Sequence, residues 1–265
     1  MRQLWIENTT EDFEGLDPEK AIAVLPVAAI EQHGPHLPVA TDTAIAQGNI
    51  ARVLDLLPDD LEPVFLPVQQ IGKSNEHLAF PGTLTFTSET LVRMWTEIGD
   101  SVARAGFRKM IIVNSHGGNV QAMEIVAREL RVRHGMFVVA SSWSRFGQPE
   151  GLYDADELRF GIHAGDMETS MMLYLTPDLV KMDKAENFVP ASVEMESDYK
   201  RLRATGNVAA FGWMSQDLNE KGACGNAANA TAEKGQKSND FAARAFIELL
   251  EDVTRFPLSA LGHSE

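Results

Sequence analysis

The sequence contains one cysteine, no long apolar run, and too few basic residues to balance its acidic ones. The single thiol, Cys224, excludes an internal disulfide framework, and we expect it to pack in the core because no sequence feature places a base beside it. No stretch of about 18 apolar residues occurs, and the acidic N-terminus lacks the apolar segment of a signal peptide. We therefore expect neither export nor a membrane span, and we expect the protein in the cytoplasm.

The charge of the chain is strongly negative, with 23 Lys and Arg against 38 Asp and Glu and a formal net charge of -15. This balance argues against nucleic acid or an anionic membrane as a partner, because both require clustered Lys and Arg. A chain of 265 residues can bury a substantial core. It shows no internal repeat, low-complexity tract or linker, which favours a single domain over residues 1–265.

Apolar patterning predicts alternating strands and helices. Apolar runs at 21–27, 63–69, 108–114 and 136–142 predict strands, and helical spacing predicts helices over 43–57, 88–105, 120–134, 167–175 and 238–256. Asp42 is expected at or near the N-cap of the first helix, and Ser88 is expected as the N-cap of the second. The alternation of predicted strands and helices along the chain predicts an α/β fold with a parallel sheet and right-handed crossovers. Residues 187–212 are expected to form a protruding arm, and residues 222–235 a loop rich in small residues.

The segment after the first predicted strand, VAAIEQHGPHLPVATD, concentrates acidic and imidazole side chains in a loop. In irregular or extended backbone, residues two apart share a side, so Glu31 and His33 can converge while Gln32 faces away. Two prolines disfavour a helix that would scatter them. The same residue composition also suits a polar surface loop, and Asp42 also suits the N-cap of a helix.

Three later predicted loops carry further candidate ligands, and loops at the carboxyl ends of parallel strands gather at one sheet edge. These candidates are Glu76, His77, His116, His163, Asp166 and Glu168. Carboxylate and imidazole ligands without thiolate suit Zn²⁺, Mn²⁺ or Fe²⁺, among which the sequence does not choose. A carboxylate that bridges two ions holds them about 3.5 to 4 Å apart, the spacing that two-metal hydrolysis uses.

With these residues laid out, the chain resembles the creatininase (creatinine amidohydrolase) family. The matching motifs are EQHGPHLPVATD at 31–42, GKSNEHLAFPGTLTF at 72–86, NSHGGN at 114–119, SSWSRF at 141–146 and HAGDMETS at 163–170. The resemblance implies a single α/β domain with a parallel sheet flanked by helices on both faces. It also implies a site for two divalent metal ions, a small-molecule amide substrate and a homohexamer assembled from dimers.

Carried over by position, the resemblance gives each metal ion a ligand set. Glu31, Asp42 and His116 look like the ligands of one ion, and His33 and Asp42 look like ligands of the second, with Asp42 bridging. Creatinine-hydrolysing members have a glutamate where this chain has Gly118. Glu168 is the expected replacement and so joins the catalytic set, although a carboxylate near a helix N-terminus also has a structural explanation.

The resemblance also assigns residues to the reaction. A water activated by two ions would attack an amide carbonyl, and His163 looks like the general acid that protonates the leaving nitrogen. The N–H groups of Gly117 and Gly118, which open a predicted helix, are candidates for holding a substrate oxygen, and Ser74 is a candidate substrate contact. The two glycines equally suit a tight turn.

The substrate is less well defined by the sequence. Creatinine-hydrolysing members share two tryptophans that cover the flat ring, and Trp143 looks like the first, although it equally suits plain packing. The second is absent from residues 158–162, where Arg159 is a candidate clamp for a carboxylate or phosphate, or an ordinary surface residue. We therefore do not predict creatinine as the substrate.

Three functional hypotheses follow from the sequence. The leading hypothesis is metal-dependent hydrolysis of a non-peptide amide, cyclic or N-formyl, of a small molecule. The second is a deformylase that acts on a nucleotide-like biosynthetic intermediate, an activity found among relatives with the HGGN turn. The third is a non-catalytic metal-binding or ligand-binding α/β module, which would leave a general-acid candidate beside a full ligand set unexplained.

Overall fold

Four parallel strands form the central sheet of the computed structural model, which describes residues 1–206 and 209–262. The strands are β1 (Ile22–Val27), β2 (Pro63–Phe65), β3 (Lys109–Asn114) and β4 (Phe137–Ser142), in the order β2-β1-β3-β4. Every neighbouring pair is parallel. All residues of β1, β2 and β3 are buried, as expected for parallel strands covered on both faces.

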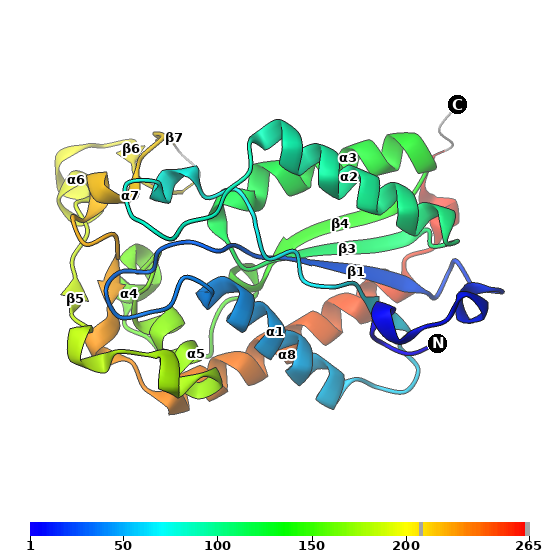
Figure 1. Ribbon diagram of the computed structural model, residues 1–265, viewed down its shortest axis with the longest axis horizontal. Coiled ribbons are helices and arrows are strands. Elements are labelled where there is room, and N and C mark those ends of the chain that lie inside the picture. Colours follow the sequence, from blue (N-terminus) through cyan, green and yellow to red (C-terminus); the bar gives the residue numbers. More distant parts are fainter. Residues whose placement is uncertain (207–208, 263–265) are drawn as a thin grey trace.

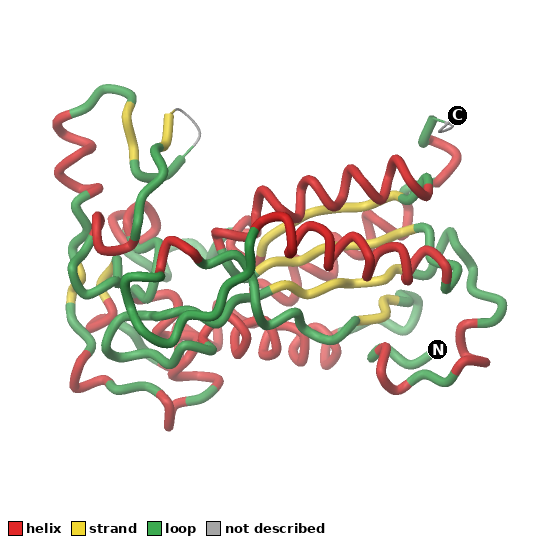
Figure 2. Tube along the Cα trace, turned by 45° about the horizontal axis from the view of Figure 1, so that its top comes forward, coloured by secondary structure: helices red, strands yellow, loops and turns green. Residues whose placement is uncertain are grey.

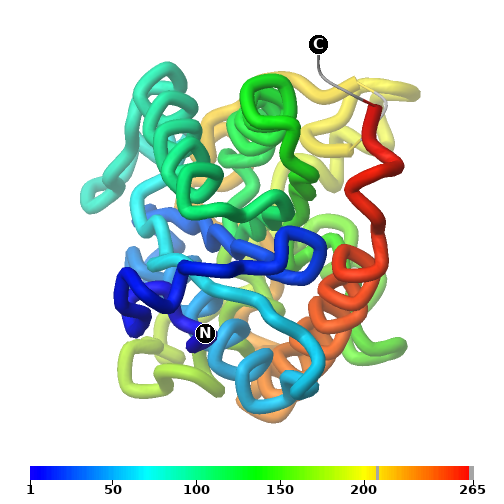
Figure 3. The backbone as a smooth tube through the Cα atoms, turned by 90° about the vertical axis from the view of Figure 1, so that its right-hand side faces the viewer, coloured from blue at the N-terminus to red at the C-terminus, as the bar shows by residue number. Residues whose placement is uncertain are grey.

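Two pairs of helices cover the sheet. Helices α2 (Ser88–Arg104) and α3 (Val120–His134) lie on one face, and α1 (Thr41–Leu56) and α8 (Ala232–Arg255) lie on the other (Figures 1 and 3). Because successive side chains of a strand point to opposite faces, the buried core is divided into two parts, one on each face of the sheet. The predicted α/β fold, with a parallel sheet flanked by helices on both faces, is confirmed.

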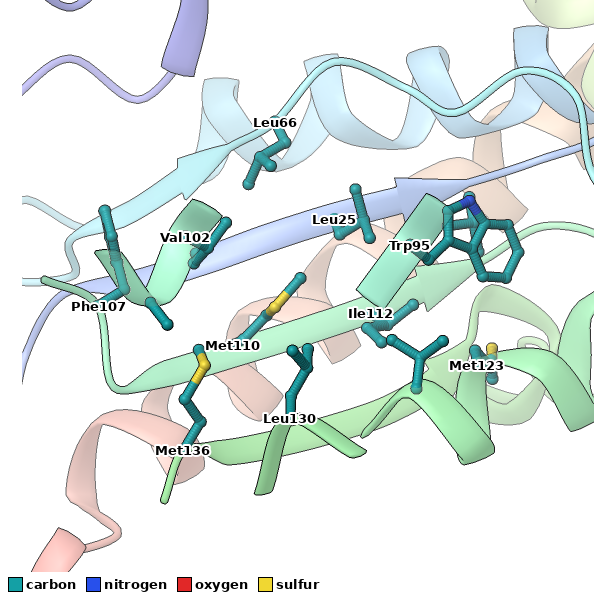
Figure 4. Close-up of a cluster of buried hydrophobic side chains, with 14 of the residues drawn as sticks. Leu25, Leu66, Trp95, Val102, Phe107, Met110, Ile112, Met123, Leu130 and Met136 are labelled. Carbon is teal, nitrogen blue, oxygen red and sulfur yellow. The ribbon is translucent and has the colours of Figure 1, made fainter. Parts of the chain in front are cut away.

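Each face of the sheet has its own buried apolar cluster. On the α2–α3 side, Leu25 of β1 and Ile112 of β3 pack with Trp95 of α2, all fully buried (Figure 4). On the other side, Val24 and its neighbours pack with Phe246 of α8. These clusters hold the strand ends in place, and the loops after β1 and β3 extend from them on the side of the molecule away from both chain termini (Figure 1).

Helix α3 has the predicted bounds, but three other helices begin earlier or are capped differently than predicted. Helix α1 begins at Thr41, so Asp42 lies inside its first turn and is not its N-cap. The N-cap of α2 is Thr87, whose hydroxyl oxygen accepts the Thr90 N–H at 3.3 Å. Helix α8 begins at Ala232, so its first turns fall in the segment predicted as a loop.

Shorter elements fill the remainder of the chain. They are α4 (Ala155–Phe160), α5 (Asp166–Leu175), α6 (Ser192–Asp198), α7 (Ser215–Leu218), β5 (Asn187–Phe188), β6 (Leu202–Arg203), β7 (Ala209–Ala210) and β8 (Gly225–Asn226). Short 3-10 helices span Trp5–Glu7, Thr10–Phe13, Asn75–His77, Gly117–Asn119, Trp143–Phe146, Pro177–Leu179, Met182–Lys184, Ala227–Asn229 and Leu258–Ala260. Figure 2 shows α6, β6 and β7 projecting from the rest, as predicted for the arm at 187–212, of which residues 207 and 208 lie outside the described residues.

Among residues 1–206 and 209–262, no helix combines the length and the apolar character needed to cross a membrane.

Candidate metal centre

Acidic and imidazole side chains from four segments meet beyond the carboxyl ends of β1 and β3. Glu31 and His33 follow β1, Asp42 lies in the first turn of α1, His116 follows β3, and Glu168 lies in α5. Among the described residues, four groups of three have ligand atoms within 4.8 Å of one another, and two of them consist only of predicted ligands: Glu31, Asp42 and His116, and His33, Asp42 and Glu168. Asp42 belongs to both groups. The structure therefore brings together all five predicted metal ligands, with the predicted bridging residue between the two sets.

The distances within each group suit a shared cation. His116 Nδ1 lies 3.1 Å from Glu31 Oε2 and 3.5 Å from Asp42 Oδ2. His33 Nε2 lies 3.4 Å from Asp42 Oδ1 and 3.7 Å from Glu168 Oε2. Atoms that bind one ion at about 2 Å are separated by such distances, since tetrahedral or octahedral ligands stand about 3 to 3.5 Å apart.

Backbone carbonyls fix which nitrogen each of these histidines presents. His116 Nε2 donates to the Lys73 carbonyl oxygen at 2.8 Å, and His33 Nδ1 donates to the Glu31 carbonyl oxygen at 3.0 Å. A carbonyl oxygen only accepts, so each neutral ring has its bare nitrogen on the opposite side, toward the carboxylates. This is the arrangement that orients metal-binding histidines.

Without a cation, these atoms leave hydrogen-bonding capacity unsatisfied. Glu31 Oε2, Asp42 Oδ2 and His33 Nε2 are buried and have no hydrogen-bond partner within the described part of the chain. Buried polar atoms are rarely left unpaired, and acceptors that face one another repel. A divalent cation between them would satisfy all three. The donor set, oxygen and imidazole nitrogen without sulfur, fits Zn²⁺, Mn²⁺ or Fe²⁺.

The pKa shifts in the cluster show how strongly its groups interact. Burial lowers the pKa of His33, but the carboxylates of Asp42 and Glu168 outweigh it and raise that pKa to about 9. Burial raises the pKa of Glu168 to about 7. Burial and the neighbouring Glu31 charge raise the pKa of Asp42 as well. Protons thus compensate part of the charge in the cluster, and cation binding would displace them.

Two more histidines border the cluster. His77 Nε2 and His163 Nδ1 lie 3.4 and 3.6 Å from the same oxygen, Glu31 Oε1. The His163 ring lies against the rings of His33 and His77, with centroids 4.2 and 4.4 Å apart. Burial, followed by the charges of His33 and His77, holds the pKa of His163 well below its ordinary value. The predicted general-acid candidate is thus beside the predicted ligands.

The predicted substrate contacts divide into two sets. Ser74 is buried, with its Oγ 3.2 Å from His116 Nε2. Gly117 and Gly118 lie in the 3-10 helix that follows His116, in front of α3. A Cβ at Gly118 would clash with the Lys73 carbonyl oxygen and come within 2.5 Å of Glu76 Oε1. Residue 118 therefore has no space for a glutamate in this structure.

Trp143 and Arg159 lie outside the cluster. Trp143 is buried in the core on the α8 side, with its ring centroid 4.9 Å from that of Phe246. Arg159 is exposed on α4 and forms an ion pair with Glu196 of α6. Asp166, another candidate from the sequence, accepts a hydrogen bond from Lys234 at 2.5 Å and also lies apart from the cluster.

Sequence reasoning missed the role of Gln32. The alternation of sides predicts that Gln32 faces away from Glu31 and gives it no part in the site. In the structure, the side-chain nitrogen of Gln32 lies 2.7 Å from His77 Nδ1, and its main-chain carbonyl oxygen lies 2.7 Å from His163 Nε2. No spacing rule signals this contact, because the loop leaves the strand geometry on which the alternation depends. His36 is also buried, and its Nε2 lies 2.9 Å from Thr169 Oγ1, away from the predicted ligands.

Comparison with known proteins relates this chain to several hydrolases. A family model described as creatinine amidohydrolase matches residues 7–250. The mycofactocin precursor peptide peptidase of Mycolicibacterium smegmatis is 34% identical over 220 residues, which cover 82% of this chain and 78% of that protein. The creatinine amidohydrolase of Pseudomonas putida is 33% identical over 186 residues, covering 64% of this chain and 70% of that protein.

Solved structures of creatininases have the same fold. One described as a manganese creatininase superimposes with a TM-score of 0.76 at 23% identity, covering 97% of this chain and 100% of that one. A mutant creatininase of zinc–zinc type gives a TM-score of 0.75 at 24% identity, with the same coverage.

Proposed function

This chain belongs to the creatininase family, and from that membership we propose that it is a metal-dependent hydrolase that cleaves a carbonyl–nitrogen bond. The observation that carries the proposal is the pair of ligand groups that share Asp42. A single bridging carboxylate with an imidazole on each side is the arrangement of two-metal hydrolysis. The related hydrolases described as acting on creatinine and on a precursor peptide support the same bond type.

We assign the predicted ligands as two sets. Glu31, Asp42 and His116 would hold one ion, and His33, Asp42 and Glu168 would hold the other. When bound, two divalent cations, Zn²⁺, Mn²⁺ or Fe²⁺, lower the pKa of a water molecule and polarise the substrate carbonyl. Solved relatives described as manganese and zinc–zinc forms support this choice of metals.

His163 is proposed as the residue that moves the proton. Its Nε2 donates to the Gln32 carbonyl oxygen at 2.7 Å, so the neutral ring has a bare Nδ1 that faces Glu31. Its lowered pKa keeps the ring neutral and ready to accept. Nδ1 would take the proton released by the attacking water and then donate it to the leaving nitrogen. The Glu31 carboxylate beside it would stabilise the imidazolium between these two steps.

The substrate is proposed to bind next to the turn at residues 117–119. The space around Gly117 is open, since a Cβ there would meet no atom of the described chain within 4 Å. Backbone N–H groups of Gly117 and Gly118 would hold a substrate oxygen, and Ser74 would contact the substrate from the facing loop. Trp143 packs in the core and Arg159 pairs at the surface, so neither has a role in this proposal.

A small-molecule amide, cyclic or N-formyl, remains the leading substrate class. A peptide bond near a chain terminus is the second candidate, because the relatives that are 33 to 34% identical over most of this chain include peptidases. We further propose, from family resemblance alone, that the protein assembles as a homohexamer. Size-exclusion chromatography with light scattering would test that assembly.

Metal analysis of purified protein, alongside hydrolysis of a panel of cyclic amides, formamides and short peptides, tests the proposal. We expect two ions per chain in the wild type, none in Asp42→Asn and one in Glu168→Gln. Both variants should lose turnover by at least about 100-fold, since even residues behind the ligands cost 10- to 100-fold. Glu194→Gln, at an exposed position of α6, serves as the control. Full metal content and turnover in Asp42→Asn would refute the proposal.

A further inference from the structure

We propose that Gln32 is a positioning residue that fixes the ring tautomers of His77 and His163, so that the two rings act on Glu31 in opposite ways. His77 would present an N–H to the carboxylate, and His163 would present a bare nitrogen. The inference rests on the proposed function for its catalytic meaning. The assignment of the two ring tautomers rests on hydrogen bonds alone.

The orientation of the Gln32 amide is determined by two backbone groups. Its Oε1 accepts the Gly34 N–H at 2.9 Å, and its Nε2 donates to the Gly222 carbonyl oxygen at 2.8 Å. An exchanged amide would set donor against donor at Gly34 and acceptor against acceptor at Gly222. The nitrogen therefore lies on the His77 side, with one N–H left to donate.

That remaining N–H sets the tautomer of His77. Gln32 Nε2 lies 2.7 Å from His77 Nδ1, so Nδ1 is the acceptor and the neutral ring has its proton on Nε2. The protonated Nε2 atom of His77 lies 3.4 Å from Glu31 Oε1 and 4.0 Å from Glu76 Oε1. His77 thus turns an N–H toward the carboxylate, and in this tautomer its Nε2 has no lone pair to bind a cation.

The backbone of Gln32 sets the tautomer of His163. The Gln32 carbonyl oxygen accepts from His163 Nε2 at 2.7 Å, which leaves Nδ1 bare and 3.6 Å from Glu31 Oε1. One residue thereby determines both rings, His77 through its side chain and His163 through its main chain. Glu31 Oε1 thus faces the His77 N–H at 3.4 Å, while Glu31 Oε2 faces His116 Nδ1 at 3.1 Å.

The surroundings of the Gln32 amide are shaped to hold it. Gly222 has φ +73°, and a Cβ there would lie 2.5 Å from Gln32 Oε1. Only glycine adopts that backbone readily and leaves the amide its space. Gln32 is 5% exposed, so water does not compete for its hydrogen bonds. The amide is therefore a fixed element between the two rings.

The first test is the histidine ring pattern in ¹⁵N-resolved NMR spectra, recorded on metal-free and on zinc-loaded protein at pH 7.5. We expect the His77 and His163 rings to be neutral and protonated on Nε2 in the metal-free protein. A proton on Nδ1 of His77 would overturn the proposal. This measurement needs neither metal nor substrate, so its result is separate from the fate of the proposed hydrolase activity.

The second test changes the amide with Gln32→Glu, which keeps the shape but replaces the N–H donor by an acceptor. We expect His77 to become protonated on Nδ1 and zinc affinity, measured by competition with a chelator, to fall about 10- to 100-fold. Gln121→Glu, the same change at an exposed position of α3, should leave both unchanged. Unchanged zinc affinity in Gln32→Glu would overturn the positioning role.

A pair of substitutions at His77 keeps the proposal testable if Gln32→Glu does not fold. His77→Gln retains an N–H that can reach Glu31, whereas His77→Leu removes it. We expect zinc affinity to remain within about threefold in His77→Gln and to fall about 10- to 100-fold in His77→Leu. Equal losses in the two variants would show that the N–H is not what matters and would overturn the proposal.

Discussion

Backbone carbonyl groups decide which nitrogen each histidine of the cluster presents. His33, His116 and His163 all donate one ring N–H to a carbonyl oxygen, and each turns its other ring nitrogen toward a carboxylate. A sequence gives the residue types but not these tautomers, because they depend on where the loop backbone runs. The structure therefore adds the chemistry of each ring to a residue set that the sequence had already identified.

The predicted ligands converge for a reason that the sequence does contain. Glu31 and His116 each follow a buried strand, and parallel strands bring such loops to one edge. Gln32 was not predicted, because the alternation of sides holds in a strand and fails in a loop. Trp143 illustrates the opposite difficulty. Its position after β4 resembles that of a substrate contact, yet its side chain packs against Phe246.

His36 gives a prediction about pH. Burial lowers the pKa of His36 to about 4, and its Nδ1 has no hydrogen-bond partner among the described residues. In the unfolded chain the pKa is about 6.5, so below that pH the unfolded state binds a proton that the folded state rejects. The stability contributed by neutral His36 is present above pH 6.5 and is lost as the pH falls toward 4, by roughly 3 kcal/mol.

Urea unfolding of the wild type and His36→Gln at pH 7 and pH 4.5 measures this contribution. Glutamine retains a polar group near Thr169 but does not take up a proton. Between the two pH values we expect the free energy of unfolding of the wild type to fall by roughly 2 to 3 kcal/mol more than that of the variant. Parallel losses in the two proteins would contradict the assignment of this proton to His36.

At the scale of elements, the strands and helices around the sheet were predicted to within a few residues, with one exception. Helix α8 begins at Ala232, whereas the sequence predicted a loop through residue 235. The reason is Gly235, whose position lies against the Ser170 carbonyl of α5, where a Cβ would clash. Glycine at this position lets α5 and α8 approach closely. In sequence analysis, however, a glycine is usually taken as a sign of a loop.

The turn after β3 provides a matched pair of substitutions. A Cβ at Gly118 would clash with the Lys73 carbonyl oxygen, whereas a Cβ at Gly117 would meet no described atom within 4 Å. We expect Gly118→Ala to lower the free energy of unfolding by about 1 to 3 kcal/mol, the usual cost of overpacking. Gly117→Ala should change it by less than about 1 kcal/mol, since glycine-to-alanine changes at open sites are small.

Chemical denaturation of the three proteins, in metal-free buffer, measures the difference. Metal-free conditions matter because His116 neighbours both glycines, and altered ion binding would otherwise contribute to stability. Equal stabilities for Gly118→Ala and Gly117→Ala would mean that the loop at Lys73 moves aside easily. In that case, lack of space would not explain why residue 118 differs from the glutamate of creatinine-hydrolysing members.

At the scale of the whole molecule, the cluster draws its residues from both the sheet edge and the irregular later third. Asp42 comes from α1 and Glu168 from α5, two helices that also pack on each other. Ions bound between them would link segments more than 100 residues apart in the chain. We propose that the chain folds as one domain over residues 1–265, of which 207, 208 and 263–265 lie outside the described residues.

Chelation tests the metal site and the single domain together. An ion that binds only the folded state stabilises it by about 2.7 kcal/mol at a free concentration 100 times Kd. For a chain of this size, 1 kcal/mol shifts Tm by about 2 to 4 °C, so EDTA should lower Tm by about 5 to 10 °C for each bound ion in calorimetry. We expect one transition that moves as a whole, because the ligands come from α1, α5 and the loops after β1 and β3, which are far apart in the chain. Asp42→Asn should have the same Tm with and without EDTA. A wild-type Tm unaffected by EDTA would contradict the metal site, whereas two transitions, of which only one moves, would contradict the single domain.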